Sequence, residues 1–283
     1  MKKIKVTTDS VSDLSEDLLN EHNIAVLPLL INLGDKSEPD DKNMQEKIFE
    51  HVKKTGELPK TAARNIDDYI SFFKANKKDD EELIHFCISQ KMSAGFNFAS
   101  KAAEEVPGVY VVDSKALSTG TGLLVLYACD LVKEGKLTAS EIKEKCDQRK
   151  EFLQTSFVLD KLDFLYLGGR CNAVSKFFAN LLNIKPMINV KEGAMGVGKK
   201  YRMKFEKAVF KYADDILNEF NTPHLDRAFI TYTTIDEAIL EEVKKKVKEK
   251  YNFKEVYTTV AGGTITSHCG HNTIGILYFN DGK

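Results

Sequence analysis

A short stretch near the C-terminus, ITSHCGHNTIG at residues 265–275, gathers side chains suited to binding and proton transfer. His268 and His271 lie three residues apart with Cys269 between them, a set that suggests a metal ion. A zinc site needs three or four ligands, however, and the nearby glycines predict a turn, whereas the two histidines would share a face only on a helix. We therefore expect no metal ion here, which leaves a phosphate or a carboxylate as the ligand.

A second group of polar residues follows three predicted strands of the N-terminal half. The group comprises Thr8, Asp9, Ser10, Ser89, Ser93, Asp113 and Ser114. Ligands bind beyond the carboxyl ends of the strands in an open parallel sheet, so we expect these side chains to line one crevice. Ser and Asp are also frequent helix caps and turn formers, and that structural alternative stays open.

A third stretch, YLGGRCNAVSKFFANLLNIKPMI, combines glycines, an arginine and an apolar helix pattern. Gly168 and Gly169 permit a tight turn or a close backbone approach. Arg170 follows them directly and is suited to clamping an anion. The segment at 174–183 predicts a helix, for which ordinary core packing is the simpler interpretation.

Signatures of nucleotide binding and of α/β-hydrolases are weak or missing. The segment STGTGLLV holds two glycines after a predicted strand, but no G-x-G-x-x-G with a later acidic residue is present. The sequence also contains no G-x-x-x-x-G-K-[ST] and no G-x-S-x-G. A nucleotide-binding module, and a small-molecule hydrolase that uses the Ser, Asp and His crevice, therefore stay as alternatives with little support.

Length and composition indicate a globular protein with one large domain or two of ordinary size. The chain has 283 residues, of which 42% are apolar and 29% charged. A net charge of −1 provides no broad basic surface for nucleic acid. No apolar run is long enough to span a membrane, and MKKIKVTTDS lacks the apolar core of a signal peptide. Five scattered cysteines without C-x-x-C indicate reduced thiols, so we expect a cytoplasmic protein.

The order of predicted elements divides the chain into two parts. Strands alternate with helices over residues 1 to about 150, which predicts a parallel sheet. The second half predicts several further strands with two long helices, at about 203–219 and 235–251. We therefore expect an α/β fold of two domains, a parallel-sheet domain at 1–154 and a mixed-sheet domain at 155–283.

Local signals predict individual turns and helix ends. Asp13, with Glu16 three residues later, predicts the cap of a first helix, and Asn65 predicts the cap of another. The apolar run at 24–34 predicts a buried strand, which its proline marks as an edge or a bulge. The sequence KEG at 191–193 predicts the turn of a hairpin.

Six motifs, taken in order, resemble the DegV family, and together they cover essentially the whole chain. They are TTDSVSDLSEDLLNEHNIAVLPLLINLGD, LPKTAARN, CISQKMSAGFNFA, VVDSKALSTGTGLLV, LDFLYLGGRCNAVSKFFANLLNIKPMI and SHCGHNTIGI. The resemblance implies a two-domain α/β protein that binds one long-chain fatty acid (C14–C18) in a buried tunnel between the domains. It implies no cofactor and no catalysis by the chain itself. It also implies that a separate ATP-dependent fatty acid kinase subunit phosphorylates the presented carboxylate, and that the acyl phosphate feeds phospholipid synthesis.

The resemblance also assigns residues, motif by motif. It implies that Thr61, Ser93 and His268 bind the fatty-acid carboxylate, so the ligand of the C-terminal stretch is expected to be a carboxylate. Arg170 and Arg202 stand where the family keeps basic residues, which makes them candidates for docking the kinase.

The sequence departs from the family pattern at two of these motifs. HCGHN places His271 and Asn272 where the family has proline and glycine, which bears on the geometry of that turn. TAARN lacks the serine that usually follows the threonine. We expect such changes to affect the tunnel mouth or the acyl preference.

Overall fold

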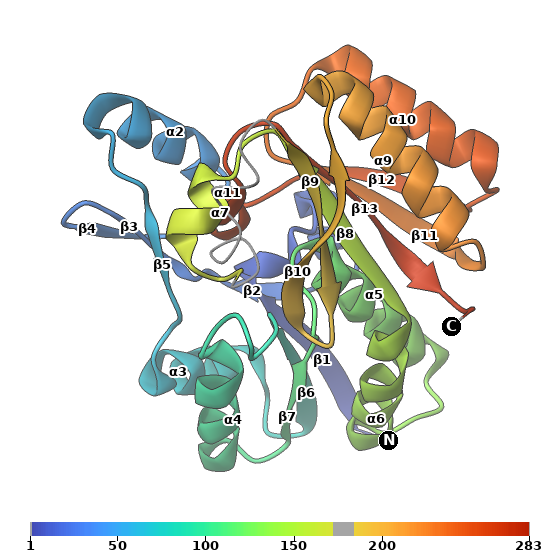
Figure 1. The fold of residues 1–283 in the computed structure, drawn as a ribbon. Coiled ribbons are helices and arrows are strands. Elements are labelled where there is room, and N and C mark those ends of the chain that lie inside the picture. The colour runs from blue at the N-terminus through green and yellow to red at the C-terminus, as the bar shows by residue number, and fades with distance from the viewer. Residues whose placement is uncertain (1, 172–183, 283) are drawn as a thin grey trace.

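The computed structural model describes residues 2–171 and 184–282, which form an N-terminal region around a parallel sheet and a C-terminal region around a mixed sheet (Figure 1). The parallel sheet has the strand order β2-β1-β6-β7. Its strands are β1 (Lys3–Asp9), β2 (Ala25–Leu27), β6 (Glu81–Cys87) and β7 (Val109–Asp113). The alternation of strands and helices in the sequence predicted this arrangement, which the structure confirms.

Helices cover both faces of the parallel sheet. Helices α3 and α4 pack on one face, and α1, α5 and α6 pack on the other. The bounds are α1 (Glu16–Glu21), α3 (Ile66–Asn76), α4 (Gly95–Glu105), α5 (Thr119–Glu134) and α6 (Ala139–Arg149), with the 3-10 turns η1 (Ser10–Ser12) and η2 (Lys150–Phe152).

Helix α5 lies between the two sheets. Eleven of its 16 residues are buried, because it packs on the parallel sheet and also on residues of the mixed sheet such as Phe229 and Leu277. A helix that is apolar on all sides is expected in such a central position. The two regions therefore share one hydrophobic core.

The mixed sheet of the C-terminal region has six strands in the order β10-β9-β8-β13-β11-β12. Only β11 and β12 run parallel; the other neighbours are antiparallel. The strands are β8 (Leu153–Leu159), β9 (Lys185–Lys191), β10 (Ala194–Tyr201), β11 (Pro223–Tyr232), β12 (Glu255–Val260) and β13 (Thr273–Asn280). Helices α9 (Phe205–Glu219) and α10 (Glu237–Lys250) cover its outer face (Figure 1).

We propose the division into 1–154 and 155–283 that the sequence predicts, close to the start of the mixed sheet. Three small elements lie where the two regions meet, and all of them bear on the site described below. A small sheet of order β4-β3-β5 precedes α3 and β6 in the chain, and α7 and α11 come from the C-terminal half. Their bounds are β3 (Leu30–Leu33), β4 (Lys36–Pro39), β5 (Lys60–Ala62), α7 (Asp163–Gly168) and α11 (Gly263–Cys269), and helix α2 (Met44–Thr55) lies between β4 and β5 in the chain.

Two local predictions are wrong. The run at 24–34 is not one strand: β2 ends before Pro28, and β3 starts at Leu30 in a different sheet, since proline cannot donate to a ladder. Ser15, and not Asp13, caps α1 by accepting a bond from the N–H of Leu18. Asp13 instead accepts hydrogen bonds from residues distant in the sequence, which are described below.

Two other local predictions are confirmed. Asn65 caps α3 in a reciprocal capping box. The hairpin of β9 and β10 turns at Glu192 and Gly193, both of which have positive φ angles. The helix predicted at 174–183 lies outside the described residues.

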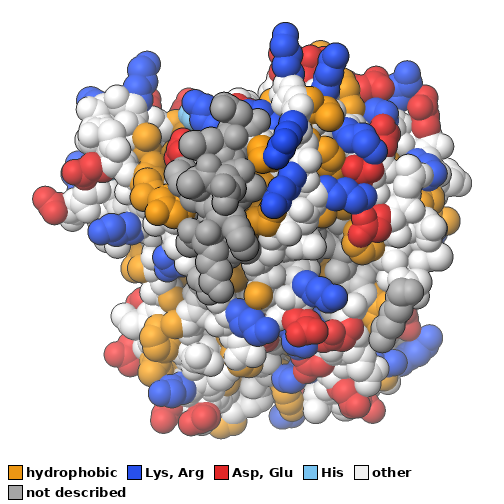
Figure 2. Space-filling model, viewed as in Figure 1, with side chains coloured by type: hydrophobic (Ala, Val, Ile, Leu, Met, Phe, Trp, Pro, Cys, Tyr) orange, Lys and Arg blue, Asp and Glu red, His pale blue; other side chains and the backbone are white. Residues whose placement is uncertain are grey.

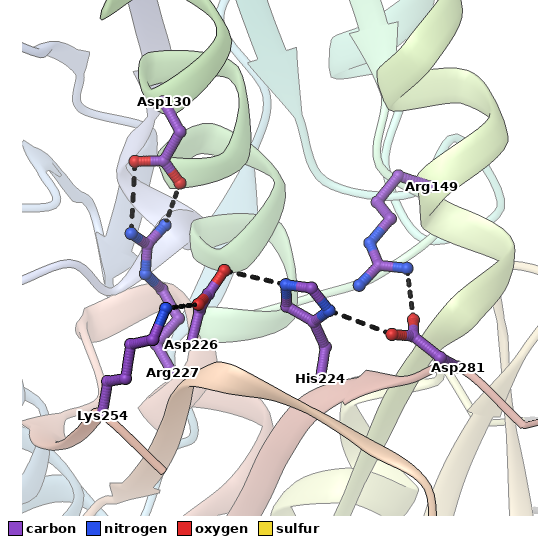
Figure 3. Close-up of polar contacts among 7 residues, drawn as sticks. All are labelled: Asp130, Arg149, His224, Asp226, Arg227, Lys254 and Asp281. Atoms are coloured by element: carbon purple, nitrogen blue, oxygen red, sulfur yellow. Dashed lines mark hydrogen bonds and ion pairs between the residues drawn. The ribbon is translucent and has the colours of Figure 1, made fainter.

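A network of ion pairs links the two regions at the ends of α5 and α6 (Figure 3). Arg227 on β11 contacts Asp130 on α5 in a bidentate manner, with N–O distances of 2.7 and 3.2 Å. Arg149 pairs with Asp281, and its guanidinium lies 4.2 Å from the ring centroid of Phe279. The ion-pair network comprises Asp130, Arg149, His224, Asp226, Arg227, Lys254 and Asp281.

Candidate functional site

A largely apolar cavity of about 240 Å³ lies where the small sheet, the loop before α4, the start of α5, and α7 and α11 meet. Its lining is Leu29, Thr61, Ala62, Ala63, Ile88, Met92, Ser93, Ala94, Phe98, Leu117, Leu165, Arg170, Met195, Thr264, Ile265, His268 and Cys269. Both regions of the chain contribute to this lining. The few polar groups come from Thr61, Ser93, Thr264, His268 and Arg170, so the cavity combines apolar walls with a small polar set, as ligand sites commonly do.

Helix α11 carries His268, which corrects the expectation of a turn in this stretch. The segment starts with Gly262 and Gly263 and continues with β-branched residues, a composition with weak helix propensity. The helix forms because side chains from the N-terminal region bind its first amides, including the N–H of Gly263. It ends at Gly270, whose φ of +68° is in the range that glycine adopts readily.

The imidazole of His268 meets Thr61 across the cavity. Nε2 lies 2.9 Å from Oγ1 of Thr61, which is 207 residues away in the chain. Nδ1 is buried and has no hydrogen-bond partner among the described residues. Burial, with the nearby Arg170 guanidinium as a second cause, lowers the pKa of His268 to about 4. The ring is therefore neutral near pH 7 when no ligand is bound.

Gly168 fixes how closely α7 approaches His268. A Cβ atom on this glycine would lie 2.3 Å from Nδ1, so any side chain here would displace the imidazole. Gly168 of the YLGGR stretch thus allows α7 and α11 to pack closely against each other. This contact joins two motifs that lie far apart in the sequence.

Ser93 reaches the cavity from the loop that precedes α4. Its Oγ accepts a hydrogen bond of 3.2 Å from the N–H of Gly95, which leaves the hydroxyl hydrogen available to a ligand. The N-cap residue of α4, Ala94, makes no side-chain capping bond and also lines the cavity. The positive end of this helix dipole therefore favours negative charge at the same place.

Comparisons with known proteins agree with this architecture. A family model described as "Uncharacterised protein, DegV family" matches residues 3–281. The chain belongs to the DegV family. A DegV domain-containing protein of Caldanaerobacter subterraneus subsp. tengcongensis is 27% identical over 280 residues, which cover 98% of this chain and 99% of that protein. The resemblance seen in the sequence is thereby confirmed.

Solved structures of DegV proteins share the fold. A fatty acid-binding DegV family protein from Thermus thermophilus is 28% identical, with a TM-score of 0.90 and coverage of 99% of this chain and 100% of that chain. A Streptococcus pneumoniae Fatty Acid Kinase (Fak) B3 protein, loaded with linoleic acid, is 22% identical, with a TM-score of 0.83 and coverage of 99% and 100%. The predicted fold class is confirmed, and these neighbours bind fatty acids.

The two arginines that the DegV motifs single out lie in different places. Arg170 lines the cavity, where its Nη1 donates a 2.9 Å bond to the carbonyl of Gly168. Arg202 follows β10, is exposed, and is absent from the described lining. Figure 2 shows lysine and arginine side chains gathered over this part of the molecule, and Lys199 and Lys204 are also exposed here.

Most of the residues at the strand ends shape loops instead of lining the cavity. Asp9 accepts a bond of 3.2 Å from the N–H of Ile88, and Ser89 donates one of 2.7 Å to the carbonyl of Gly193. Asp113 likewise accepts from two loop amides. Within residues 2–171 and 184–282, no serine hydroxyl is hydrogen-bonded to a histidine, so the described residues hold no Ser–His pair of the kind a hydrolase uses.

His271 lies apart from His268. Its ring stacks on Phe49 of α2, with ring centroids 3.5 Å apart, and its Nδ1 lies 3.0 Å from Oγ1 of Thr234. The described parts of the chain contain no group of three or more His, Cys, Asp or Glu residues arranged to hold a metal ion. In the same parts, no helix has the length and apolar character needed to cross a membrane.

Sequence reasoning missed the groups that hold α11 in place. The helix starts at Gly263 and has Gly262 at its N-cap, so it has no Ser, Thr, Asp or Asn of its own at that position. Asp40, on the loop before α2, accepts bonds from the N–H groups of Gly263 and Thr264 instead. Had the sequence predicted a helix here, the missing local cap would have indicated that its first N–H groups find an acceptor elsewhere in the chain.

Proposed function

We propose that this protein binds one long-chain fatty acid (C14–C18) in the cavity between its two regions. Thr61, Ser93 and His268 bind the carboxylate. The observation that carries the proposal is the convergence of these three side chains, from β5, the loop before α4, and α11, at one cavity with apolar walls. Fatty acid binding by the Thermus thermophilus relative supports the same ligand class.

The chemistry of a fatty acid suits this lining. Its carboxylate needs donors when it leaves water, and two hydroxyls, an imidazole and the start of α4 are available. A sixteen-carbon acid has 14 methylenes, and burying them contributes roughly 11 kcal/mol at about 0.8 kcal/mol each, before ordering costs. Apolar contacts therefore supply most of the affinity, and the polar groups select the head group.

We further propose that the protein presents this carboxylate to a separate, ATP-dependent fatty acid kinase subunit and catalyses no step itself. Arg170, which lines the cavity and is exposed, and Arg202, among other exposed basic residues, are the candidates for kinase docking. Arginine suits interface ion pairs of this kind. The fold shared with the pneumococcal Fak B3 protein supports the role, which would place the protein in the cytoplasm.

Mass spectrometry tests the ligand. Organic extraction of freshly purified protein should release about one fatty acid per chain, and added C14 to C18 fatty acids should raise the melting temperature of delipidated protein. Absence of both the lipid and the thermal shift would refute the proposal.

Turnover with a kinase tests presentation. Charge reversal at Arg202, which lies outside the described cavity lining, should slow acyl-phosphate formation by a purified fatty acid kinase subunit and leave lipid binding nearly intact. Charge reversal at Arg170, which lines the cavity, should lower both lipid binding and turnover. A parallel fall in lipid binding and turnover for the Arg202 variant would contradict its docking role.

A further inference from the structure

The first turn of α11 is bound by a carboxylate from the opposite region of the chain. Asp40 accepts hydrogen bonds from the N–H of Gly263 (2.7 Å), the N–H of Thr264 (3.0 Å) and the hydroxyl of Thr264 (2.6 Å). A fourth bond, 3.0 Å long, comes from the hydroxyl of Ser10. The side chain is buried, so these bonds are shielded from competing water.

Asp13 makes a second contact to the same turn. Its Oδ1 accepts a 2.9 Å bond from the N–H of Gly262, and its Oδ2 accepts one of 2.5 Å from the hydroxyl of Ser118. This residue adopts a left-handed conformation with φ of 49°, which turns its side chain away from the helix it was expected to cap. We call Asp13 and Asp40 the α11 anchor.

The anchor controls the place of His268 because α11 is short and intrinsically weak. His268 lies five residues after Gly263, roughly 7.5 Å along the helix at about 1.5 Å per residue. Gln45 of α2 adds bonds of 3.1 Å each to the carbonyl of Ala261 and the hydroxyl of Thr266. A tilt or rotation at the first turn would therefore move the imidazole away from Thr61.

We propose that Asp40, supported by Asp13, is a positioning residue for head-group recognition, holding His268 at hydrogen-bonding distance from Thr61 so that the site selects a carboxylate. This inference rests on the proposed fatty-acid function. The anchor does not touch the ligand. It acts through the helix that carries the ligand-binding side chain.

The chemistry of the anchor predicts how Asn should behave at each position. Asp40 faces four donors, and an amide offers only one accepting oxygen, so Asp40→Asn turns an NH₂ group toward at least one N–H or O–H donor. Asp13→Asn is milder, because Asn tolerates a left-handed backbone. Burial also raises the pKa of Asp13 to about 8, so its native carboxyl already carries a proton much of the time near pH 7.

The experiment compares two ligands of equal chain length, palmitic acid and 1-hexadecanol, on delipidated protein by calorimetry or displacement of a fluorescent lipid. Asp40→Asn should weaken palmitate binding at least 10-fold and hexadecanol binding less than 3-fold. Asp13→Asn should weaken palmitate binding about 3-fold, also with little change for hexadecanol. If the substitution only loosened the fold, the binding of palmitate and of hexadecanol would weaken by the same factor. That result would overturn the positioning role.

The matched control is Asp130→Asn. This carboxylate also joins the two regions, through Arg227, but it lies 11 residues after Thr119, the first residue of α5, about 16 Å along the helix from the end nearest the cavity. It should leave the palmitate-to-hexadecanol ratio of the wild type unchanged. If Asp40→Asn does not fold, the palmitate-to-hexadecanol affinity ratio of Asp13→Asn tests the proposal instead. A ratio equal to that of the wild type would then overturn the proposal. Failure of wild-type protein to bind palmitate at all would instead refute the proposed function.

Discussion

The two ends of the interface between the regions are joined by different chemistry. At the cavity end, buried carboxylates accept short hydrogen bonds from backbone amides and hydroxyls. At the other end, the ion-pair network joins partly exposed side chains, with His224 between Asp226 and Asp281 at 2.8 and 3.0 Å (Figure 3). Buried hydrogen bonds fix geometry and are costly to break, whereas exposed ion pairs contribute little. The proposed head-group site lies at the end that is held by buried hydrogen bonds.

The largest difference between the ends should appear on removing Asp40 of the α11 anchor. Asp40→Ala leaves four donors without their acceptor at a buried place, so the free energy of unfolding should fall by about 3 kcal/mol or more. Urea denaturation followed by circular dichroism measures this. A loss below about 1 kcal/mol would mean that the carboxylate is not needed to stabilise α11.

His268 should dominate recognition of the head group. Replacing it by Ala should weaken fatty acid binding by roughly 1.5 to 3 kcal/mol, the usual loss for a hydrogen bond to a charged group. His271→Ala is the matched control and should cost less, since that ring stacks on Phe49 outside the cavity lining. Equal losses for the two histidines would contradict the assignment.

The ionisation of His268 should change with the ligand. In delipidated protein its pKa should lie near 4, so its contribution to stability is present above the unfolded pKa of about 6.5 and is lost as the pH falls toward 4. A bound carboxylate favours the charged imidazole and should raise this pKa. NMR titration of the imidazole with and without palmitate measures both values; an unchanged or lower value in the complex would place the carboxylate elsewhere.

The smallest effects should come from the ion-pair network. Arg227→Ala removes a bidentate but partly exposed pair, and the free energy of unfolding should fall by about 1 kcal/mol, less at high salt. Denaturation at two salt concentrations tests this, with fatty acid affinity as the control that should not change. A loss as large as that of Asp40→Ala would erase the contrast between the two ends.

The sequence was informative where local signals decide the structure. The cap at Asn65 and the hairpin turn at Glu192 follow from patterns within a few residues, and the parallel sheet follows from the alternation of strands and helices over residues 1 to about 150. It misled where distant contacts override propensity. The glycines of ITSHCGHNTIG predicted a turn around His268, yet Asp40 binds the first amides of a helix that spans Gly263–Cys269. The three residues proposed to bind the carboxylate were identified only through the family motifs, because no local pattern predicts that Thr61 lies next to His268.

The position of β13 has a consequence for the order of assembly during synthesis. β13 lies between β8 and β11 in the mixed sheet, although the ribosome makes it after every other strand of either sheet. α11 is also made late, and its pairing of His268 with Thr61 spans 207 residues. Such non-local contacts form slowly and late. A nascent chain can therefore complete its parallel sheet before it completes the proposed lipid site. Under the proposed function, lipid binding would then require that α11 and β13 have already been synthesised.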